Sequence, residues 1–563
     1  MKNKMKIYGI IFLIAVILIA PLLKFNTYIL GHDSLFHISN IEAIKQAFLS
    51  GNWFFPQIYP IIANGYGYGT GLFYGPIPHL GTALISFIFP SVSTMTVMKL
   101  IHFLVIFLSM LFMYNFIYKL TKKQYLSLIP AILYVTFPYF LTDIFVRDAY
   151  AESLTFVYIP LIFNGLYELL YLNNDKKFYI LFIPAVVALV LTHTITTFYT
   201  AIFIMLFLLL NIRKVFKKKN FKALCISLIF IIGICAFYYV PMLEQKAFSN
   251  INIFNDGVTA TKESVMSNAL NISALFPYPG NQTENGLQFF ILIPMIILIF
   301  ISFCKYKEYK NDNKKIFLDF IIIGLISLFM STKFFPWGKV PDIMLYIQFP
   351  WRLLLFSAFF LSAFSVLGLL DFNPKFEKVL SVILIILVVS NSLSLINIKK
   401  VAEYDISAVD INSMGIGAVK DYLPMKAVEN YEYFENRSKD IIILEGKGKI
   451  EILDYEAPYM KFNAELESDY MVIELPLLYY FGYNVDSHRT YYDTNASSDA
   501  LDKLGYKIEE SKNGFVQLTI TNSRQYIVNY TGSKYSEYAK YISLISIIIY
   551  VIYIQKKRGD ENA

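Results

Sequence analysis

The first residues with catalytic potential follow an apolar run at the start of the chain. They are Gly31-His32-Asp33-Ser34, with His37 shortly after. A carboxylate beside histidines at a membrane surface can act as the general base for a hydroxyl group, so Asp33, His32 and His37 are candidate catalytic residues. The competing interpretation is structural, because Asp and Ser are favoured N-cap residues and a helix is expected from residue 35 onward.

Two further segments, 147–153 (RDAYAES) and 346–352 (YIQFPWR), combine an arginine with acidic, amide or aromatic side chains. Their candidate residues are Arg147, Asp148, Glu152, Gln348, Trp351 and Arg352. An arginine beside long apolar helices is costly unless it is paired or solvated, so both arginines are candidate ligands of a lipid phosphate.

Each of these segments also has a structural interpretation. Arg147 can pair with Asp143 or Asp148, and acids at a helix start are favoured by its dipole. Arg352 can snorkel from an interfacial aromatic belt. His193, in Leu-Thr-His-Thr, is a supporting candidate, although a histidine there is more typical of a hydrogen-bonded helix end than of a catalyst.

The composition is that of a membrane protein. Hydrophobic residues make up 56% of the 563 residues and charged residues only 16%, against about one quarter charged in soluble domains. Apolar runs of about 20 residues cross the hydrocarbon core as helices, since lipid offers no partners to unpaired backbone groups. We expect an all-α polytopic protein with about twelve such helices, at 6–24, 96–119, 125–145, 152–172, 178–194, 196–212, 221–243, 287–304, 316–332, 353–370, 377–396 and 540–555.

The net charge of +7 does not indicate a nucleic-acid partner, because the basic residues lie in short blocks between apolar runs, where they set the membrane topology. Lysine and arginine gather in alternate connections, at 119–123, 176–177, 213–222, 305–315, 375–378 and 556–558. The positive-inside rule then places both termini in the cytoplasm, and the candidate site loops and residues 397–539 outside a multi-pass plasma-membrane protein. The apolar segment 75–91 is too short to span and is expected, like 34–50, to form a surface helix.

Residues 397–539 differ from the rest of the chain. They alternate polar and apolar residues in short runs such as YMVIELPLLYY and FVQLTI, which predicts an extracytoplasmic β-rich domain. The expected organisation is a transmembrane module at 1–396 with a first outer loop at 25–95, the β-rich domain at 397–539, and a final helix with a cytoplasmic tail at 540–563. The aromatic and glycine-rich loop 52–79 suits either a sugar or a membrane interface.

Several of these segments together resemble a known family. The segments HDSLFHI, GNWFFPQIYP, GYGYGTGLFYGPIPH, RDAYAES and QFPWRLL resemble the bacterial membrane family labelled "6-pyruvoyl-tetrahydropterin synthase-related", and the wider YfhO-like group with the GT-C glycosyltransferase architecture. The resemblance covers residues 1–400, with ELPLLYYFGYNV in the C-terminal domain. The pterin label is not taken as a function, because no cluster of three histidines is available for the zinc of a soluble pterin synthase.

The GT-C resemblance implies an acidic catalytic residue in the first outer loop, which Asp33 matches. It also implies a polyprenyl-phosphate-linked sugar as donor substrate and inverting transfer outside the cytoplasm. Asp33 has no adjacent second acid, so no metal site is assigned. A divalent cation would have to recruit Glu42, Asp148 or Glu152.

We therefore expect a membrane glycosyltransferase that moves a sugar to a cell-envelope glycan or protein. Two other classes stay open. A transporter or flippase of lipid-linked glycans predicts inverted repeats and ionisable residues at mid-bilayer. A non-catalytic envelope scaffold would present residues 397–539.

Overall fold

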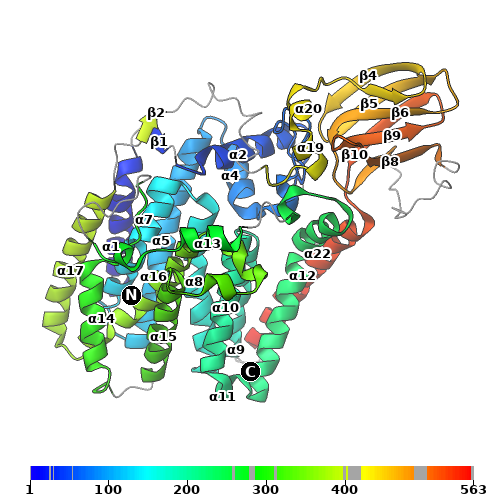
Figure 1. Cartoon of the computed structure of the whole chain (residues 1–563). Helices are drawn as coiled ribbons and strands as arrows, with labels where there is room; N and C mark the ends of the chain where they lie inside the picture. The colour runs from blue at the N-terminus through cyan, green and yellow to red at the C-terminus, as the bar shows by residue number, and fades with distance from the viewer. Residues whose placement is uncertain are drawn as a thin grey trace.

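The structure is a computed structural model that describes residues 2–23, 27–29, 31–53, 55–255, 260–277, 286–309, 313–396, 401–403, 420–486 and 504–559. Figure 1 shows a body of helices with a smaller β domain at one side of its upper end. The mostly helical architecture with a C-terminal β domain agrees with the fold class expected from the sequence.

Seven helical segments within the described residues are long and apolar enough to cross a membrane. They are Lys4–Leu22 (α1, Lys2–Ile19, with the turn that follows), α5 (Thr94–Thr121), α8 (Tyr150–Leu170), α12 (Lys218–Phe248), Pro350–Leu369 (containing α16, Leu354–Ser365), Lys375–Leu395 (in α17, Pro374–Leu395) and Lys534–Lys557 (in α22, Lys534–Gly559). The expected number of twelve is not confirmed.

Four of the other expected spans form shorter helices. These are α9 (Asp175–Val190), α10 (Thr194–Leu210), α14 (Ile293–Lys305) and α15 (Lys314–Met330), of 13 to 17 residues. At 1.5 Å per residue they reach about 20–26 Å, short of a hydrocarbon core of about 30 Å. The shortest of them, α14, begins at Ile293 although its apolar run begins at residue 287.

The expected span 125–145 is broken. It consists of α6 (Leu128–Val135) and a second segment, Pro138–Arg147, at 45° to it. Pro138 explains the break, because proline has no N–H to donate and its ring clashes with the preceding turn. The second segment contains α7 (Pro138–Thr142) and a π-helical turn, η2 (Asp143–Arg147).

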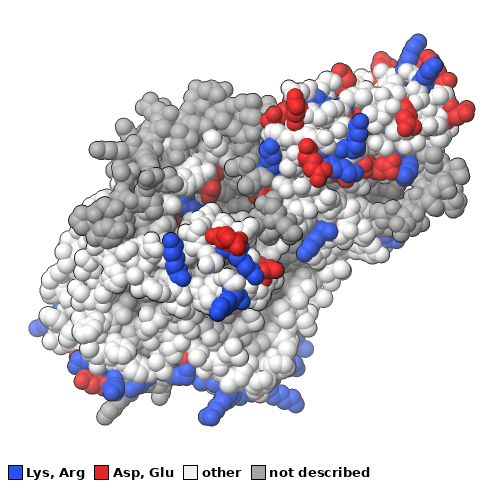
Figure 2. Space-filling model, in the orientation of Figure 1, with Lys and Arg blue, Asp and Glu red and all other residues white. Residues whose placement is uncertain are grey.

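The basic connections meet at one end of the helical body. Lys557 of α22 and Lys219 of α12 both pair with Asp175 at the start of α9, at 2.6 and 3.2 Å. Lys119 of α5 pairs with Glu168 near the end of α8. Figure 2 shows Lys and Arg along this lower end, below a band that is almost free of charge. The cytoplasmic orientation of this end remains a prediction.

The opposite end carries short helices. They are α2 (Ser34–Leu49), α3 (Thr70–Phe73) and α4 (Pro76–Ile88), and α2 lies beside α4 at the top of Figure 1. Helices α2 and α4 occupy the segments 34–50 and 75–91 where surface helices were expected. A strand in the same region, β1 (Thr27–Ile29), pairs with β2 (Val401–Glu403) from the segment after α17.

The β domain consists of two antiparallel four-stranded sheets, in the orders β4-β5-β10-β7 and β3-β6-β9-β8. The strands are β3 (Ile442–Glu445), β4 (Gly448–Glu456), β5 (Tyr459–Leu466), β6 (Met471–Leu478), β7 (Tyr483–Val485), β8 (Tyr506–Glu510), β9 (Phe515–Ile520) and β10 (Arg524–Tyr530). Two short helices, α19 (Met425–Glu429) and α20 (Tyr431–Asn436), precede them. Burial alternates along β5 and β9, as expected for strands with one face on a core.

The aromatic and glycine-rich loop 52–79 joins the β domain to the helical body. The backbone N–H of Leu478 donates to the carbonyl of Tyr66 at 3.0 Å, and that of Gly69 to the hydroxyl of Tyr480 at 3.0 Å. Tyr59, Tyr66 and Tyr68 are at most 2% exposed and belong to the core shared with the strands. These tyrosines are therefore not an open platform for a sugar.

Thiol labelling tests the orientation of the two ends. In a variant whose three native cysteines are replaced, a cysteine at Ser438 should react with an impermeant thiol reagent added to intact cells. A cysteine at Lys218 should react only after lysis. Both positions are exposed, whereas Ser34 is fully buried and gives no usable signal. Labelling in intact cells of the cysteine at Lys218, but not of the one at Ser438, would show that the topology is the inverse of the expected one.

Candidate functional site

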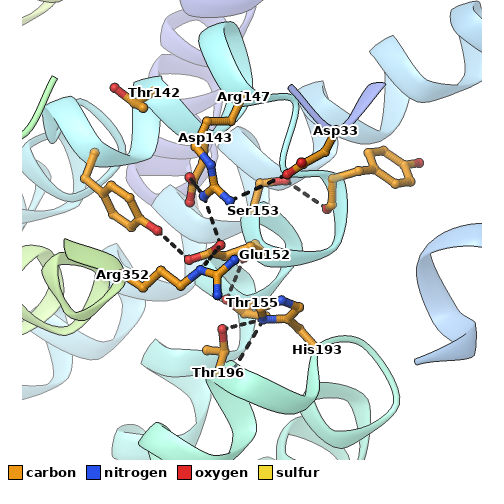
Figure 3. Close-up of polar contacts among 12 residues, drawn as sticks. Asp33, Thr142, Asp143, Arg147, Glu152, Ser153, Thr155, His193, Thr196 and Arg352 are labelled. Carbon is orange, nitrogen blue, oxygen red and sulfur yellow. Dashed lines mark hydrogen bonds and ion pairs between the residues drawn. The ribbon is translucent and has the colours of Figure 1, made fainter. Parts of the chain in front are cut away.

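Two arginines and three carboxylates meet at the upper end of the helical body. Arg147 ends the π-helical turn η2, and Glu152 lies in the first turn of α8. Arg352 belongs to the 3-10 turn η7 (Pro350–Leu353) before α16, and Asp33 precedes α2. Figure 3 shows Glu152 between the side chains of the two arginines.

Arg147 is buried and held by carboxylates. Its Nη1 donates to Oδ1 of Asp143 at 2.7 Å and to Oε2 of Glu152 at 3.0 Å. The ring of Trp351 lies under the guanidinium, 4.8 Å from its central carbon, in cation–π geometry. The alternative in which Arg147 pairs with Asp143 is thus confirmed.

Glu152 connects the two arginines. The same oxygen, Oε2, that accepts from Arg147 lies 3.4 Å from Nε of Arg352. The hydroxyl of Tyr139 donates to the other oxygen, Oε1. The Glu152 side chain is only 3% exposed, so its charge depends on these partners and not on water.

Arg352 is held mainly by neutral acceptors. Its Nη1 donates to the carbonyl of Ile347 at 3.0 Å and to Oε1 of Gln348 at 2.9 Å. Gln348 has a positive φ of 59°, which is unusual for a residue with a side chain. In the described part of the chain, no group accepts a hydrogen bond from the buried Nε of Arg352.

Asp33 lies at the edge of this cluster. Its Oδ2 is 3.5 Å from Nη2 of Arg147, and its side chain is 40% exposed, against 6% for Arg147. Asp33 occupies the N-cap position of α2, but its side chain forms no capping hydrogen bond there. The capping interpretation therefore does not describe this carboxylate.

The backbone fixes the position of Asp33. Its N–H donates to the carbonyl of Arg147 at 3.0 Å. A Cβ at Gly31 would lie 2.4 Å from the same carbonyl oxygen, so the loop can approach the Arg147 turn this closely only with glycine there.

The histidines occupy different surroundings. His37 is buried, with Nδ1 2.8 Å from Nε2 of His79, and burial lowers its pKa. His32 is exposed on the turn before Asp33. His193 precedes α10, where its Nδ1 accepts from the backbone N–H of Thr196 at 3.4 Å, and burial lowers its pKa to about 4. His193 is thus neutral at physiological pH, and Figure 3 shows it beside Arg352.

Asp148 belongs to a separate cluster. Its Oδ1 lies 2.9 Å from Nε2 of His102 and accepts from the hydroxyl of Tyr28 at 3.1 Å. The residue has a positive φ of 52°, and its carboxylate is paired with His102 of α5, while Arg147 pairs with other acids. The alternative pairing of Arg147 with Asp148 is therefore wrong.

Sequence reasoning did not select Tyr139, His79 or His102 for these clusters. Tyr139 and His79 lie in apolar segments with no distinguishing pattern. His102 gave a usable signal, because an ionisable residue within an apolar helix is usually functional or paired.

The carboxylates do not assemble into an evident metal site. Among the described residues, no group of three or more His, Cys, Asp or Glu side chains has a suitable arrangement. Glu42, a candidate second carboxylate for Asp33 on sequence grounds, pairs with Lys45 at 2.8 Å and accepts from the hydroxyl of Thr94.

Comparison with known proteins places most of the helical body in one family. Residues 72–398 match the family model described as "6-pyruvoyl-tetrahydropterin synthase related domain; membrane protein". An uncharacterized protein of Lactococcus lactis subsp. cremoris (strain MG1363) is 27% identical over 348 residues, which are 60% of this chain and 55% of that protein. The chain thus spans about half the length of this relative.

One solved structure shows a weaker similarity to this chain. The cryo-EM structure of arabinofuranosyltransferase AftD from Mycobacteria matches 77% of this chain and 29% of its own chain, with 12% identity and a TM-score of 0.43.

Replacing Glu152 tests the electrostatic balance of the site. Glu152→Gln leaves two buried guanidinium groups without their shared carboxylate, and breaking a buried ion pair typically costs about 3–5 kcal/mol. We expect a correspondingly lower free energy of unfolding for the purified protein in detergent. Glu308→Gln removes an exposed carboxylate from Lys305 and should leave the melting temperature unchanged. Equal stability of the Glu152 variant and the wild type would contradict this account of the site.

Proposed function

The chain belongs to the family of membrane proteins described as 6-pyruvoyl-tetrahydropterin synthase related, and on that premise we propose that it is a membrane glycosyltransferase. It transfers a sugar from a polyprenyl-phosphate donor to an extracytoplasmic acceptor of the cell envelope, a glycan or a protein. The observation that carries the proposal is the convergence of an open carboxylate, Asp33, with the guanidinium groups of Arg147 and Arg352.

Asp33 supplies the general base. The acceptor hydroxyl gives its proton to the Asp33 carboxylate while its oxygen forms a bond to the anomeric carbon of the donor sugar. The bond between that carbon and the phosphate oxygen breaks, and the lipid phosphate leaves with the electron pair. Of the three carboxylates around Arg147, Asp33 is by far the most exposed, which suits contact with an acceptor.

The two arginines differ as phosphate ligands. Arg147 already donates to two buried carboxylates, so it would have to exchange one of them to hold a phosphate. Arg352 donates to a carbonyl and an amide, and its Nε has no hydrogen bond in the described structure. Arg352 is therefore the better placed of the two to stabilise the departing phosphate, with Arg147 acting nearby on Asp33.

The position of the site suits a lipid-linked donor. It lies at the start of α8 and before α16, both within candidate membrane spans, and at the end opposite the basic connections. A lipid carrier in the outer leaflet can present its phosphate at this level. His193, a neutral hydrogen-bonding group beside Arg352, and Trp351, under Arg147, complete the proposed donor side of the site.

Substitution of Asp33 tests the function. Asp33→Asn keeps the size of the side chain, and the backbone bond from residue 33 to Arg147 does not involve it. The variant should fold with a near-normal melting temperature but lose sugar transfer by at least about 100-fold, the usual lower contribution of a general base. The assay is transfer of radiolabelled sugar from a polyprenyl-phosphate donor by the purified protein, with sugar incorporation into the cell envelope measured in parallel.

A matched control lies on α2, the helix that Asp33 precedes. Glu42→Gln removes a carboxylate of α2 that is engaged with Lys45 and Thr94, and should retain transfer. Full transfer by a well-folded Asp33→Asn protein would sink the catalytic assignment. It would then favour transport of lipid-linked glycans or an envelope scaffold.

Arg352→Lys tests the donor phosphate site. A lysine keeps the charge but lacks the planar fork that holds phosphate and Gln348 together. We expect weaker donor use, seen as a raised KM for the polyprenyl-phosphate sugar and a reduced kcat. Arg524→Lys, in an ion pair of the β domain, is the matched change and should alter neither constant. Unchanged donor kinetics in the Arg352 variant would remove this residue from the phosphate site.

A further inference from the structure

We propose that a buried latch of three side chains positions Asp33, the proposed general base. The latch consists of Tyr28, Asp148 and His102. It holds the start of the short loop that leads to Asp33, while a backbone hydrogen bond holds the end of that loop. The role of Asp33 in catalysis rests on the proposed function, but the spectroscopic test of the latch needs no substrate.

The latch converges on one carboxylate oxygen. Oδ1 of Asp148 accepts from the Tyr28 hydroxyl at 3.1 Å and lies 2.9 Å from Nε2 of His102. The Tyr28 hydroxyl is itself 3.4 Å from that ring nitrogen. All three residues are at most 1% exposed, so water does not compete for this oxygen. Hydrogen bonds to a buried carboxylate are stronger than those at a protein surface, so the three groups form a firm joint.

The three latch residues come from three separate parts of the chain. Tyr28 lies in β1, between α1 and α2, whereas His102 belongs to α5. Asp148 lies between the π-helical turn η2 and α8. Helix α5 packs against both α1 and α8. The latch therefore attaches the segment that follows α1 to two helices that are already packed together.

The other end of the loop is attached to the same turn. The N–H of Asp33 donates to the carbonyl of Arg147 at 3.0 Å, and Arg147 directly precedes Asp148. Between the two attachments, a Cβ at Gly31 would lie 2.7 Å from the Cβ of Asp148, so the loop lies directly against the turn. Because both ends of the loop 28–33 are held at adjacent positions, the Asp33 carboxylate stays 3.5 Å from the Arg147 guanidinium, as Figure 3 shows.

A second tyrosine distinguishes positioning of Asp33 from simple joining of helices. Tyr8 of α1 donates to Oδ1 of Asn115 in α5 at 3.0 Å. This contact joins the segment at the start of the chain to α5, as the latch does, but it lies near the other end of both helices. Loss of the Tyr8 hydroxyl should therefore weaken helix packing without releasing Asp33.

Spin labelling measures the freedom of the loop directly. The label is attached through His32→Cys, at an exposed position, in full-length protein whose three native cysteines are replaced. Tyr28→Phe removes one hydroxyl and leaves His102 on Asp148, so the protein should fold in detergent as the wild type does. Its electron paramagnetic resonance spectrum should nevertheless change from that of an immobilised label to that of a mobile one. Tyr8→Phe should leave the spectrum unchanged.

Gly31→Ala provides the spectrum of a displaced loop. The added Cβ would lie 2.4 Å from the carbonyl oxygen of Arg147, so the loop has to move away from the turn. This variant should give a mobile label even though the latch residues are intact. Its spectrum sets the scale on which Tyr28→Phe is judged.

Sugar transfer supplies a second measurement, in proteins that retain His32. Tyr28→Phe should lower kcat by about 10-fold or more, because a small displacement of a catalytic group costs up to about 100-fold in rate. The KM for the polyprenyl-phosphate sugar should stay unchanged, because Arg352 is not attached to the latch. General loosening of the site would raise KM as well. Tyr8→Phe should alter neither constant.

Three outcomes would overturn the proposal. One is an immobilised label in Tyr28→Phe when Gly31→Ala gives a mobile one, and another is a mobile label in Tyr28→Phe with unchanged kcat. The third is the same mobile label and lower kcat in Tyr8→Phe. If Tyr28→Phe does not accumulate, Asp148→Asn, which removes the charge from the shared oxygen, is judged by the same outcomes. A wild type without transfer in every condition would count against the proposed function, and the spectra would still decide whether the latch holds the loop.

Discussion

A carboxylate buried between two guanidinium groups is the interaction on which the upper end of the helical body depends. Glu152 cannot be hydrated, and neither can Arg147, so each requires the other and both require additional partners. Three features of the neighbouring chain supply them. The π-helical turn brings Asp143 onto Arg147, the break at Pro138 brings the Tyr139 hydroxyl onto Glu152, and the 3-10 turn before α16 brings Arg352 alongside.

The same cluster explains why irregular backbone occurs at this depth. Non-helical backbone near a membrane is tolerated where it is buried in protein and its polar groups find partners. The turn at 143–149 meets this condition, because the N–H of Ala149 donates to the carbonyl of Asp143 at 2.8 Å and the carbonyl of Arg147 accepts from Asp33. Asp148 and Gln348 both have positive φ values. The contact of Asp148 with His102 and the hydrogen bond from Arg352 to Gln348 stabilise these conformations.

The sequence was sufficient to select the main residues of the candidate site but not their pairing. Arg147, Glu152 and Arg352 stood out because charged residues are rare beside apolar helices. The partner of Arg147 could not be chosen, because Asp143 and Asp148 are both close in sequence and only the left-handed conformation of Asp148 directs it to His102. The number of spans is not confirmed where a helix is shorter than its apolar run, as at α14, which begins at Ile293 although the run begins at residue 287.

The structural role of the aromatic and glycine-rich loop 52–79 could not be predicted from the sequence, because its tyrosines contact residues more than 300 positions further along the chain. Its tyrosines dock the β domain, and the loop then continues toward the site. Phe73 stacks on Tyr422 at 5.3 Å, its carbonyl accepts from Tyr238 at 2.8 Å, and the Tyr238 hydroxyl lies 3.3 Å from that of Thr194. Thr194 begins α10 directly after His193. Contacts thus run from Tyr422, ahead of the β domain, through Phe73 and Tyr238 to Thr194, the residue next to His193.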